Sequence, residues 1–273
     1  PQATLDRFVF LGLVALIGLG MLHSVLYHVP VALAFWTMLG VASARLDLYL
    51  GQPQRARTEL RAASVEAGPG DVGLLVEMGR LLTELGSTSE AEAALHAAAT
   101  GDPWQLSVMA ILRGRALAAK AEAKRAERAF VEAMHGFAAL EADIGGAHAQ
   151  RHFAEIVAAA GQGKRATTML GRAAEVFDEV GDTVNATQCR MRLAELLIGI
   201  GDDGAEAQLE RVMAAAREAS AHGLLALARG VLGVVRTIEH RYDDAEQLFF
   251  LALAGSAPDH KRIQSLFALH LLL

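Results

Sequence analysis

Residues 161–164, Gly-Gln-Gly-Lys, look like the end of a phosphate-binding loop. That loop needs a glycine five residues before its second one, and a serine or threonine directly after its lysine. This sequence has Ala158 and Arg165 at those two positions. We therefore expect an inter-helix turn at residues 161–164, and we predict no nucleotide or other cofactor.

Two histidines and the single cysteine are the next candidates for chemistry. His148 and His152 are four residues apart, which places them on one face of a helix, and Glu155 follows one turn later. No glutamate stands between them as in a zinc-protease motif, so we predict solvent-facing histidines and no metal site. Cys189 has no recognisable histidine or aspartate motif beside it, and we predict a packing role for it. The sequence thus predicts no catalytic residue.

The composition favours helices and excludes several classes of protein. Hydrophobic residues make up 53% of the 273 residues but aromatics only 5%, so alanine and leucine supply most of the apolar surface. One cysteine excludes a disulfide framework, and the absence of polar low-complexity runs excludes a disordered chain. The net charge of −6 gives no electrostatic basis for binding nucleic acid. Because the chain begins with Pro1 and ends in three leucines, we expect a segment of a longer protein.

The positions that must arrange any site belong to a repeat that begins near residue 31. An alanine is followed by leucine or phenylalanine four residues later and by a small residue three further on, and these units start 35 to 40 residues apart. The central residues of the six copies, predicted to be core, are Leu60, Leu95, Phe130, Leu170, Leu209 and Phe249. The turns predicted before the copies lie at Gly51, Gly86, Ala121, Gly161, Gly201 and His240. Each unit therefore reads as helix, tight turn, helix.

This pattern resembles the tetratricopeptide repeat (TPR) family. One copy carries the small and apolar residues of that family at its offsets: Leu75, Met78, Gly79, Leu82, Gly86, Ala91, Leu95, Ala98 and Pro103. The resemblance implies an all-α, right-handed α-solenoid over residues 31–273, with about six stacked helix-turn-helix units and a partial seventh. The longer units resemble the TPR arrays of bacterial signalling proteins, including the sensor arms of MalT-like transcription regulators. For residues 261–273 we expect a lone first helix with its apolar face uncovered, including Ile263, Leu266, Phe267 and Leu271.

An apolar segment precedes the repeats. Residues 8–27 are long and apolar enough to cross a bilayer, and residues 29–44 form a second apolar run. We predict a transmembrane segment within residues 1–30, with burial of both runs in a soluble array as the alternative. Arg7 before the runs and Arg45 after them favour a cytoplasmic location for both flanks. Residues 23–40 also resemble the last membrane hairpin of O-antigen ligase-like glycosyltransferases over a short stretch.

Charged residues give the candidates for partner binding. The densest cationic cluster comprises Arg113, Arg115, Lys120, Lys124, Arg125 and Arg128. We read it as a solvated helix face, or alternatively as an anchor for an acidic peptide or anionic ligand. The TPR resemblance implies that the first helix of each unit lines a concave groove. Counting back from the repeated alanines predicts five groove residues, Arg115, His148, Arg151, Glu155 and Arg190.

The predicted function is therefore that of a non-catalytic bacterial scaffold. It would hold a protein or peptide partner in the groove, with membrane contact through residues 8–27 and the array in the cytoplasm. A soluble cytoplasmic array is the alternative for location. Two alternatives stay open for function: the sensing arm of a MalT-like regulator, and the C-terminal part of an O-antigen ligase-like enzyme.

Overall fold

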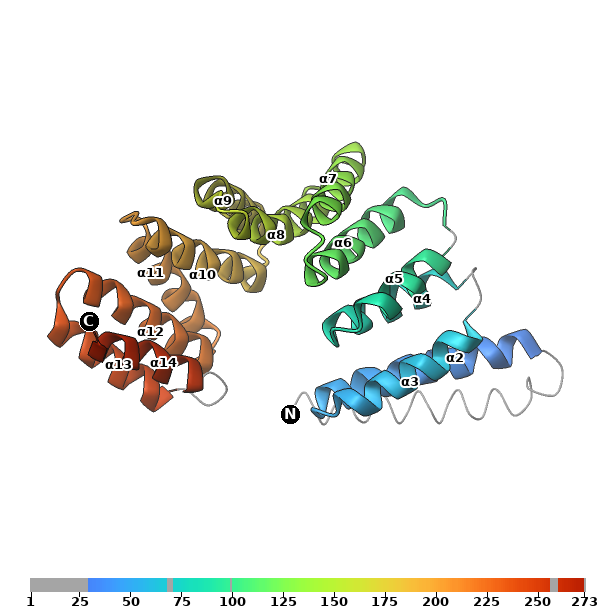
Figure 1. Ribbon diagram of the computed structural model, residues 1–273, viewed down its shortest axis with the longest axis horizontal. Helices are drawn as coiled ribbons and strands as arrows, with labels where there is room; N and C mark the ends of the chain where they lie inside the picture. The colour runs from blue at the N-terminus through green and yellow to red at the C-terminus, as the bar shows by residue number, and fades with distance from the viewer. Residues whose placement is uncertain (1–28, 68–70, 99, 256–259, 273) are drawn as a thin grey trace. The chain divides into compact units, whose positions relative to one another are not determined.

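The computed structural model describes residues 29–67, 71–98, 100–255 and 260–272, and this part of the chain is built of α-helices joined by turns and short loops (Figure 1). The chain divides into two compact units, residues 1–126 and residues 127–273. The first unit contains α2 (Val29–Tyr49), α3 (Pro53–Glu66), α4 (Val72–Glu84), α5 (Thr88–Ala97), α6 (Pro103–Ala119) and the first turn of α7 (Ala123–Ala139). The second unit contains the rest of α7, then α8 (Asp143–Ala159), α9 (Gly163–Glu179), α10 (Thr183–Ile200), α11 (Ala205–Glu218), α12 (His222–Ile238), α13 (Tyr242–Gly255) and α14 (His260–Leu272).

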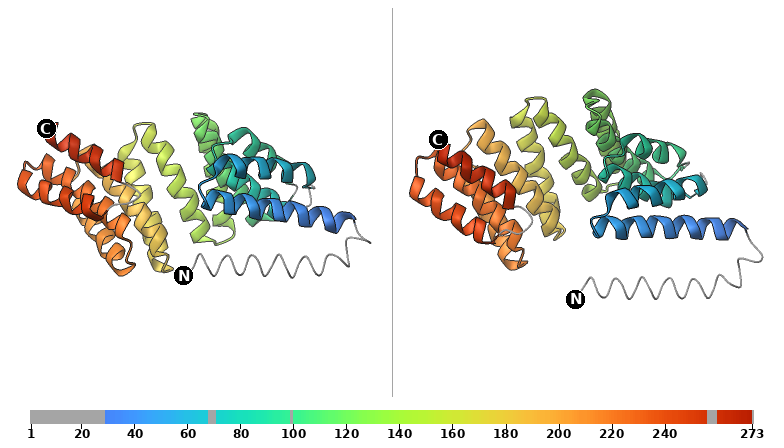
Figure 2. Two further views of the ribbon diagram at one scale, coloured as in Figure 1. Left: turned by 90° about the horizontal axis from the view of Figure 1, so that it is seen from below. Right: turned by 60° about the horizontal axis from the view of Figure 1, so that its bottom comes forward.

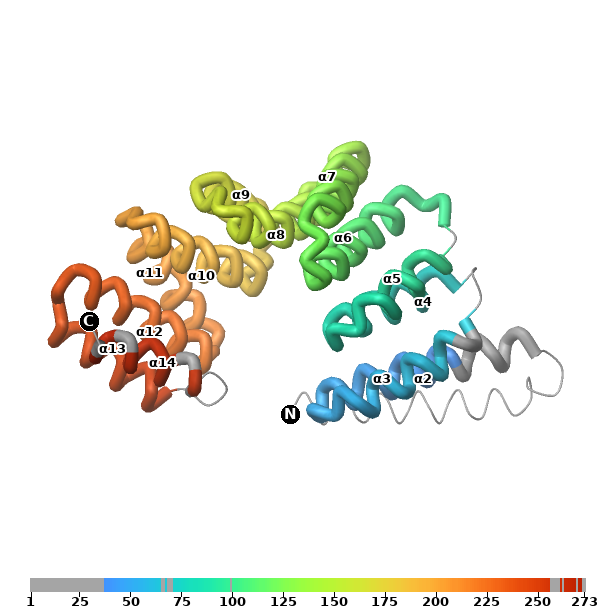
Figure 3. Tube along the Cα trace, viewed as in Figure 1, coloured from blue at the N-terminus to red at the C-terminus, as the bar shows by residue number. Residues whose placement is uncertain are grey.

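Successive helices pack as antiparallel pairs, as the repeat predicts. In the first unit α2 packs against α3 and α4 against α5; in the second unit α8 packs against α9, α10 against α11 and α12 against α13. The Cα trace in Figure 3 reverses direction between the members of each pair. Both views in Figure 2 show α12, α13 and α14 side by side. The predicted all-α helical stack is confirmed.

The repeated leucine and phenylalanine residues form the core. Leu60 and Leu95 in the first unit are no more than 2% exposed, and the same holds for Phe130, Leu170, Leu209 and Phe249 in the second. Glycines on the first helices let the second helices approach closely. A Cβ atom on Gly79 would lie 2.7 Å from the Leu95 side chain, and one on Gly233 would lie 2.9 Å from the Phe249 ring. Large and small positions of the two helices therefore interlock, which confirms the predicted register.

The predicted turn residues adopt the left-handed conformation. Positive φ angles occur at Gly51, Gly86, Gly161 and Gly201, and also at Ala121 and His240, where glycine is absent. At the α8–α9 turn the amide of Gln162 donates to the carbonyl of Val157 (3.0 Å), which closes the helix end. Residues 161 and 162 therefore form the turn between the two helices, and Gly163 and Lys164 begin α9.

The second apolar run belongs to the repeat array. Residues 29–44 lie within α2, whose Val41 and Ala44 are buried in the core that α3 and α4 complete. Gly40 permits this contact, because a Cβ there would lie 3.2 Å from the Cβ of Ala63. Among the helices that the structure describes, none combines the length and apolar character of a membrane span. The predicted transmembrane residues 8–27 lie outside the described residues.

The expectation of an uncovered apolar face on the last helix is wrong for Ile263. Ile263 is fully buried, because α14 packs on α12 beside Gly230. Phe267 also contacts the ring of Phe249, with centroids 5.4 Å apart. Leu271, by contrast, is 68% exposed, as expected.

Candidate functional site

The first helices α8 and α10 present matching polar triads. His148, Arg151 and Glu155 lie on α8, and Asn185, Gln188 and Arg192 occupy α10 with the same spacing, each 37 residues later. Residues three and four apart share one face of a helix. We call the surface formed by these six residues the α8–α10 face.

Arg151 links the two helices of this face. Its Nη1 atom donates to Oδ1 of Asn185 (2.8 Å) and to Oε1 of Gln188. Asp182, the N-cap of α10, fixes Asn185 by accepting hydrogen bonds from its backbone amide (3.0 Å) and its side-chain amide (2.6 Å). These bonds lower the pKa of Asp182. The guanidinium of Arg151 is therefore held over the start of α10.

Glu155 and Arg192 form a second link one turn further along both helices. The Nε atom of Arg192 lies 2.9 Å from a carboxylate oxygen of Glu155, and its Nη1 atom donates to Glu195 (3.0 Å). The side chains of Arg192 and Glu155 are 37% and 48% exposed, so a partner can still reach them. The face thus offers a positioned cation and a positioned anion one helical turn apart.

The two histidines of α8 pack against separate aromatic rings. His148 meets the edge of Phe177, with centroids 4.8 Å apart, and His152 stacks on Phe130 at 6.4 Å. Burial, with a smaller contribution from the charge of Arg151, lowers the pKa of His148, so its imidazole is neutral at physiological pH. Within the described residues no group of three His, Cys, Asp or Glu side chains is arranged to hold a metal ion.

Arg190 lies apart from the other predicted groove residues. Its guanidinium pairs with the carboxylate of Asp178 on α9 (Nη1 to Oδ1, 3.0 Å), and its side chain is only 13% exposed. Each residue turns a helix by about 100°, so Arg190 points to the opposite side from Gln188 and Arg192. Counting from the repeated alanine selected Arg190 and missed Arg192. The polar spacing shared by α8 and α10 was the signal that could have found Arg192.

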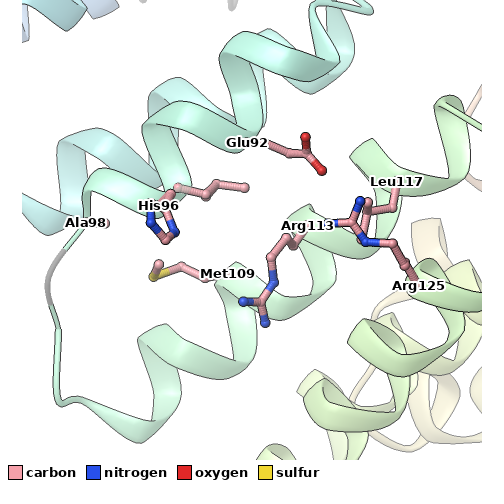
Figure 4. A pocket seen from close by; sticks show the side chains of 8 residues that line it. Glu92, His96, Ala98, Met109, Arg113, Leu117 and Arg125 are labelled. Carbon is pink, nitrogen blue, oxygen red and sulfur yellow. The ribbon is translucent and has the colours of Figure 1, made fainter. Parts of the chain in front are cut away.

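The fifth predicted groove residue and the cationic cluster lie elsewhere. Arg115 is a half-buried residue of α6, in the first compact unit. Lys120 pairs with Glu92 of α5, while Arg113 and Arg125 line a cleft between α5 and α6 (Figure 4). Lys124 and Arg128 are exposed. The cluster is therefore only in part a solvated face.

The remaining chemical candidates have structural roles. Cys189 is fully buried, and burial raises the pKa of its thiol to about 11, so it is protonated at neutral pH. Gly163 leaves space for Ile200, since a Cβ there would lie 2.7 Å from the Cγ2 atom of that side chain. Both positions serve helix packing in this structure.

Comparisons with known proteins show what this fold resembles. No protein-family model and no curated protein matches the sequence. Aspartyl phosphate phosphatase F from Bacillus subtilis aligns with 92% of this chain and 73% of its own length, at 12% identity and a TM-score of 0.69. BtubC (BKLC) from P. vanneervenii aligns with 88% of this chain and 93% of its own, at 18% identity and a TM-score of 0.62.

A third solved structure is that of a Rap protein complexed with competence and sporulation factor. It aligns with 80% of this chain and 64% of its own, at 13% identity and a TM-score of 0.62. At such identities the likeness concerns the fold alone. The chain has a TPR-like stack of helix pairs, a fold typical of protein–protein interaction domains.

Proposed function

We propose that this chain is a non-catalytic interaction module that binds a protein or peptide partner on the α8–α10 face. The observation that carries this proposal is the pair of links between α8 and α10, Arg151 to Asn185 and Glu155 to Arg192. These links fix a cation and an anion in place before any partner arrives. Preorganised side chains lose less conformational entropy on binding, which favours affinity for a segment of complementary charge.

The comparison with the Rap protein supports a partner-binding role. That protein was solved complexed with competence and sporulation factor, and 64% of it aligns with this chain. For this chain we propose a partner segment of mixed charge, with an acidic group opposite Arg151 and a basic group opposite Glu155. Arg190 is not part of this proposal, because it is paired with Asp178.

The test compares two double variants of the full chain. Arg151→Ala with Glu155→Ala removes the charges that α8 contributes to the face. Arg172→Ala with Glu175→Ala removes the same residue types from exposed positions on α9. Proteins captured from a bacterial lysate are quantified by mass spectrometry, and binding of the enriched ones is then measured after purification. The proposal expects at least one purified protein to lose about tenfold or more in affinity with the first variant and less than about twofold with the second. If no protein distinguishes the two variants, the α8–α10 face is not the binding surface.

We also propose membrane attachment, on the sequence of residues 8–27 alone. More arginines follow this segment than precede it, which favours a cytoplasmic array. The full chain should then stay with membranes in high salt and at alkaline pH, because salt releases electrostatic contacts but not a spanning helix. Release under either condition would contradict attachment. The MalT-like and ligase alternatives gain no support from the solved structures named above.

A further inference from the structure

A cleft of about 360 Å³ separates α5 from α6 in the first compact unit. The side chains of Glu92 and His96 on α5, and of Met109 on α6, point into the space between the two helices, and Arg113 of α6 also lines the cleft (Figure 4). Arg125, at the start of α7, lies at one end of it. This cleft belongs to a different unit from the α8–α10 face, so it does not depend on the function proposed above.

The floor of the cleft is apolar. Leu95 and Leu117 are buried at its base, and Met109 and Ala98 extend the same lining. The connection from α5 to α6, residues 98–102, is longer than the three residues that join α9 to α10. The apolar lining of the cleft favours a guest with an apolar side chain, since burial of that side chain removes apolar surface from water.

The rim of the cleft carries an excess of positive charge. Two cations, Arg113 and Arg125, line it, and the one acidic residue among its lining residues, Glu92, is paired with Lys120. Arg125 is paired with Glu122 three residues earlier, in an ion pair whose arginine side chain is 66% exposed. An exposed pair of this kind contributes little stability, so an incoming carboxylate can replace Glu122 at small cost.

We propose that this cleft binds an acidic peptide segment that carries a leucine or similar apolar side chain next to its carboxylates. The carboxylates would meet the guanidinium groups of Arg113 and Arg125, which can each donate two parallel hydrogen bonds. The apolar side chain would lie on Leu95, Met109 and Leu117. Recognition of acidic motifs by clustered arginines is a general mode of peptide binding, and the apolar floor adds selectivity that charge alone does not give.

The test measures fluorescence anisotropy with the full chain and a fluorescein-labelled probe peptide, Asp-Glu-Leu-Glu-Glu. Two further probes replace either all the acids by their amides or the leucine by serine. Arg113→Gln with Arg125→Gln removes the two cleft arginines. Lys124→Gln with Arg128→Gln removes two exposed cations of the same cluster that do not line the cleft. Circular dichroism melts check that both double variants stay folded.

We expect the cleft variant to lose at least about tenfold in affinity, since it removes the guanidinium groups that would donate charge-assisted hydrogen bonds to the carboxylates of the probe. The matched surface variant should lose less than about twofold. The amide probe should lose binding, and the serine probe should bind about fivefold or more weakly. In the unmutated chain, the probe should shift the NMR signal of the Met109 methyl group, assigned with Met109→Leu. This last readout does not depend on the arginine variants.

Five results would overturn the proposal. No anisotropy change at millimolar protein would exclude the site. An equal loss of affinity in both double variants would show diffuse electrostatic attraction. Equal binding of the amide probe would show a contact that does not depend on the carboxylates. Displacement of the probe by an equal concentration of inorganic phosphate would show a site for small anions. An unmoved Met109 signal during binding would place the peptide elsewhere.

Discussion

The guanidinium of Arg236 on α12 and the carboxylate of Glu206 on α11 form an ion pair between successive repeats. The Nη1 atom of Arg236 lies 2.9 Å from Oε2 of Glu206 and 2.8 Å from Oε2 of Glu239. The Arg236 side chain is only 11% exposed. The hydrogen bond from Arg236 lowers the pKa of Glu206, so the pair makes the junction of these two repeats sensitive to acid.

Glu206→Gln should lower the free energy of unfolding at pH 7 by about 1 kcal/mol or less, because the pair is partly exposed. The pKa of Glu206 is lowered by folding, so its contribution is complete above the unfolded value of about 4.3 and is lost as the pH falls through the folded value. Urea unfolding of wild type and variant should therefore differ at pH 7 and converge as the pH falls through the lowered pKa of Glu206 in the folded protein. Glu210→Gln, at an exposed position of the same helix, is the control. If the free energies of unfolding of wild type and Glu206→Gln instead diverged as the pH falls, Glu206 would not be stabilised by the ion pair with Arg236.

Gly233→Ala should destabilise the fold by about 1–3 kcal/mol. The added methyl group would lie 2.9 Å from the Phe249 ring, which is buried and cannot move aside freely. Gly171→Ala is the matched control, since nothing lies within 4 Å of a Cβ at that position of α9. It should stabilise by about 0.5–1 kcal/mol, through helix propensity. Thermal or urea unfolding measures both, and equal effects would mean that α12 and α13 do not pack as described.

Two substitutions at the turns should have opposite effects. Gly86→Ala places a side chain at a φ angle of +71° with no atom within 4 Å, so its cost is conformational and should be about 1 kcal/mol. Ala121 already occupies this conformation, at a φ angle of +60°. Ala121→Gly should therefore stabilise by up to about 1 kcal/mol, in the same unfolding assay. Destabilisation by Ala121→Gly would show that Ala121 makes contacts that outweigh the backbone strain.

Cys189 should resist thiol reagents while the protein is folded. Burial raises the pKa of the thiol to about 11 and excludes the reagent, so little thiolate forms at pH 8. Labelling with a chromogenic disulfide should be slow in buffer and complete in denaturant. In the folded protein, the labelling rate should follow the rate at which the structure opens around Cys189. Rapid labelling of the native protein would place Cys189 at the surface instead.

The sequence predicts the repeat register because packing constrains each repeated position in the same way. The spacing of the repeats predicts turns at Ala121 and His240, although neither is glycine, and the structure gives both residues positive φ angles. Interdigitation of Gly79 with Leu95 follows from the same offsets. Local sequence and global fold agree at these positions.

Polar contacts between successive repeats are harder to predict from one sequence. Arg190 and Arg192 are both arginines of α10, and only the direction of each side chain decides which one pairs with Glu155. Two arginines of the cationic cluster line the cleft between α5 and α6, but the cleft itself depends on how Met109 and Leu117 lie relative to Leu95, which the sequence does not show. Burial of Ile263 was missed because it depends on the space beside Gly230, a contact 33 residues away in sequence.

The common spacing of the triads on α8 and α10 bears on how a partner segment would align along the repeats. Glu155 and Arg192 occupy equivalent places on consecutive first helices but carry opposite charges. A bound segment with a cation opposite Glu155 would, after slipping by one repeat, bring that cation to Arg192. On the binding mode proposed above, the slipped alignment would be repelled and the aligned one attracted. The change of sign between Glu155 and Arg192 would then fix where along the stack the proposed partner begins.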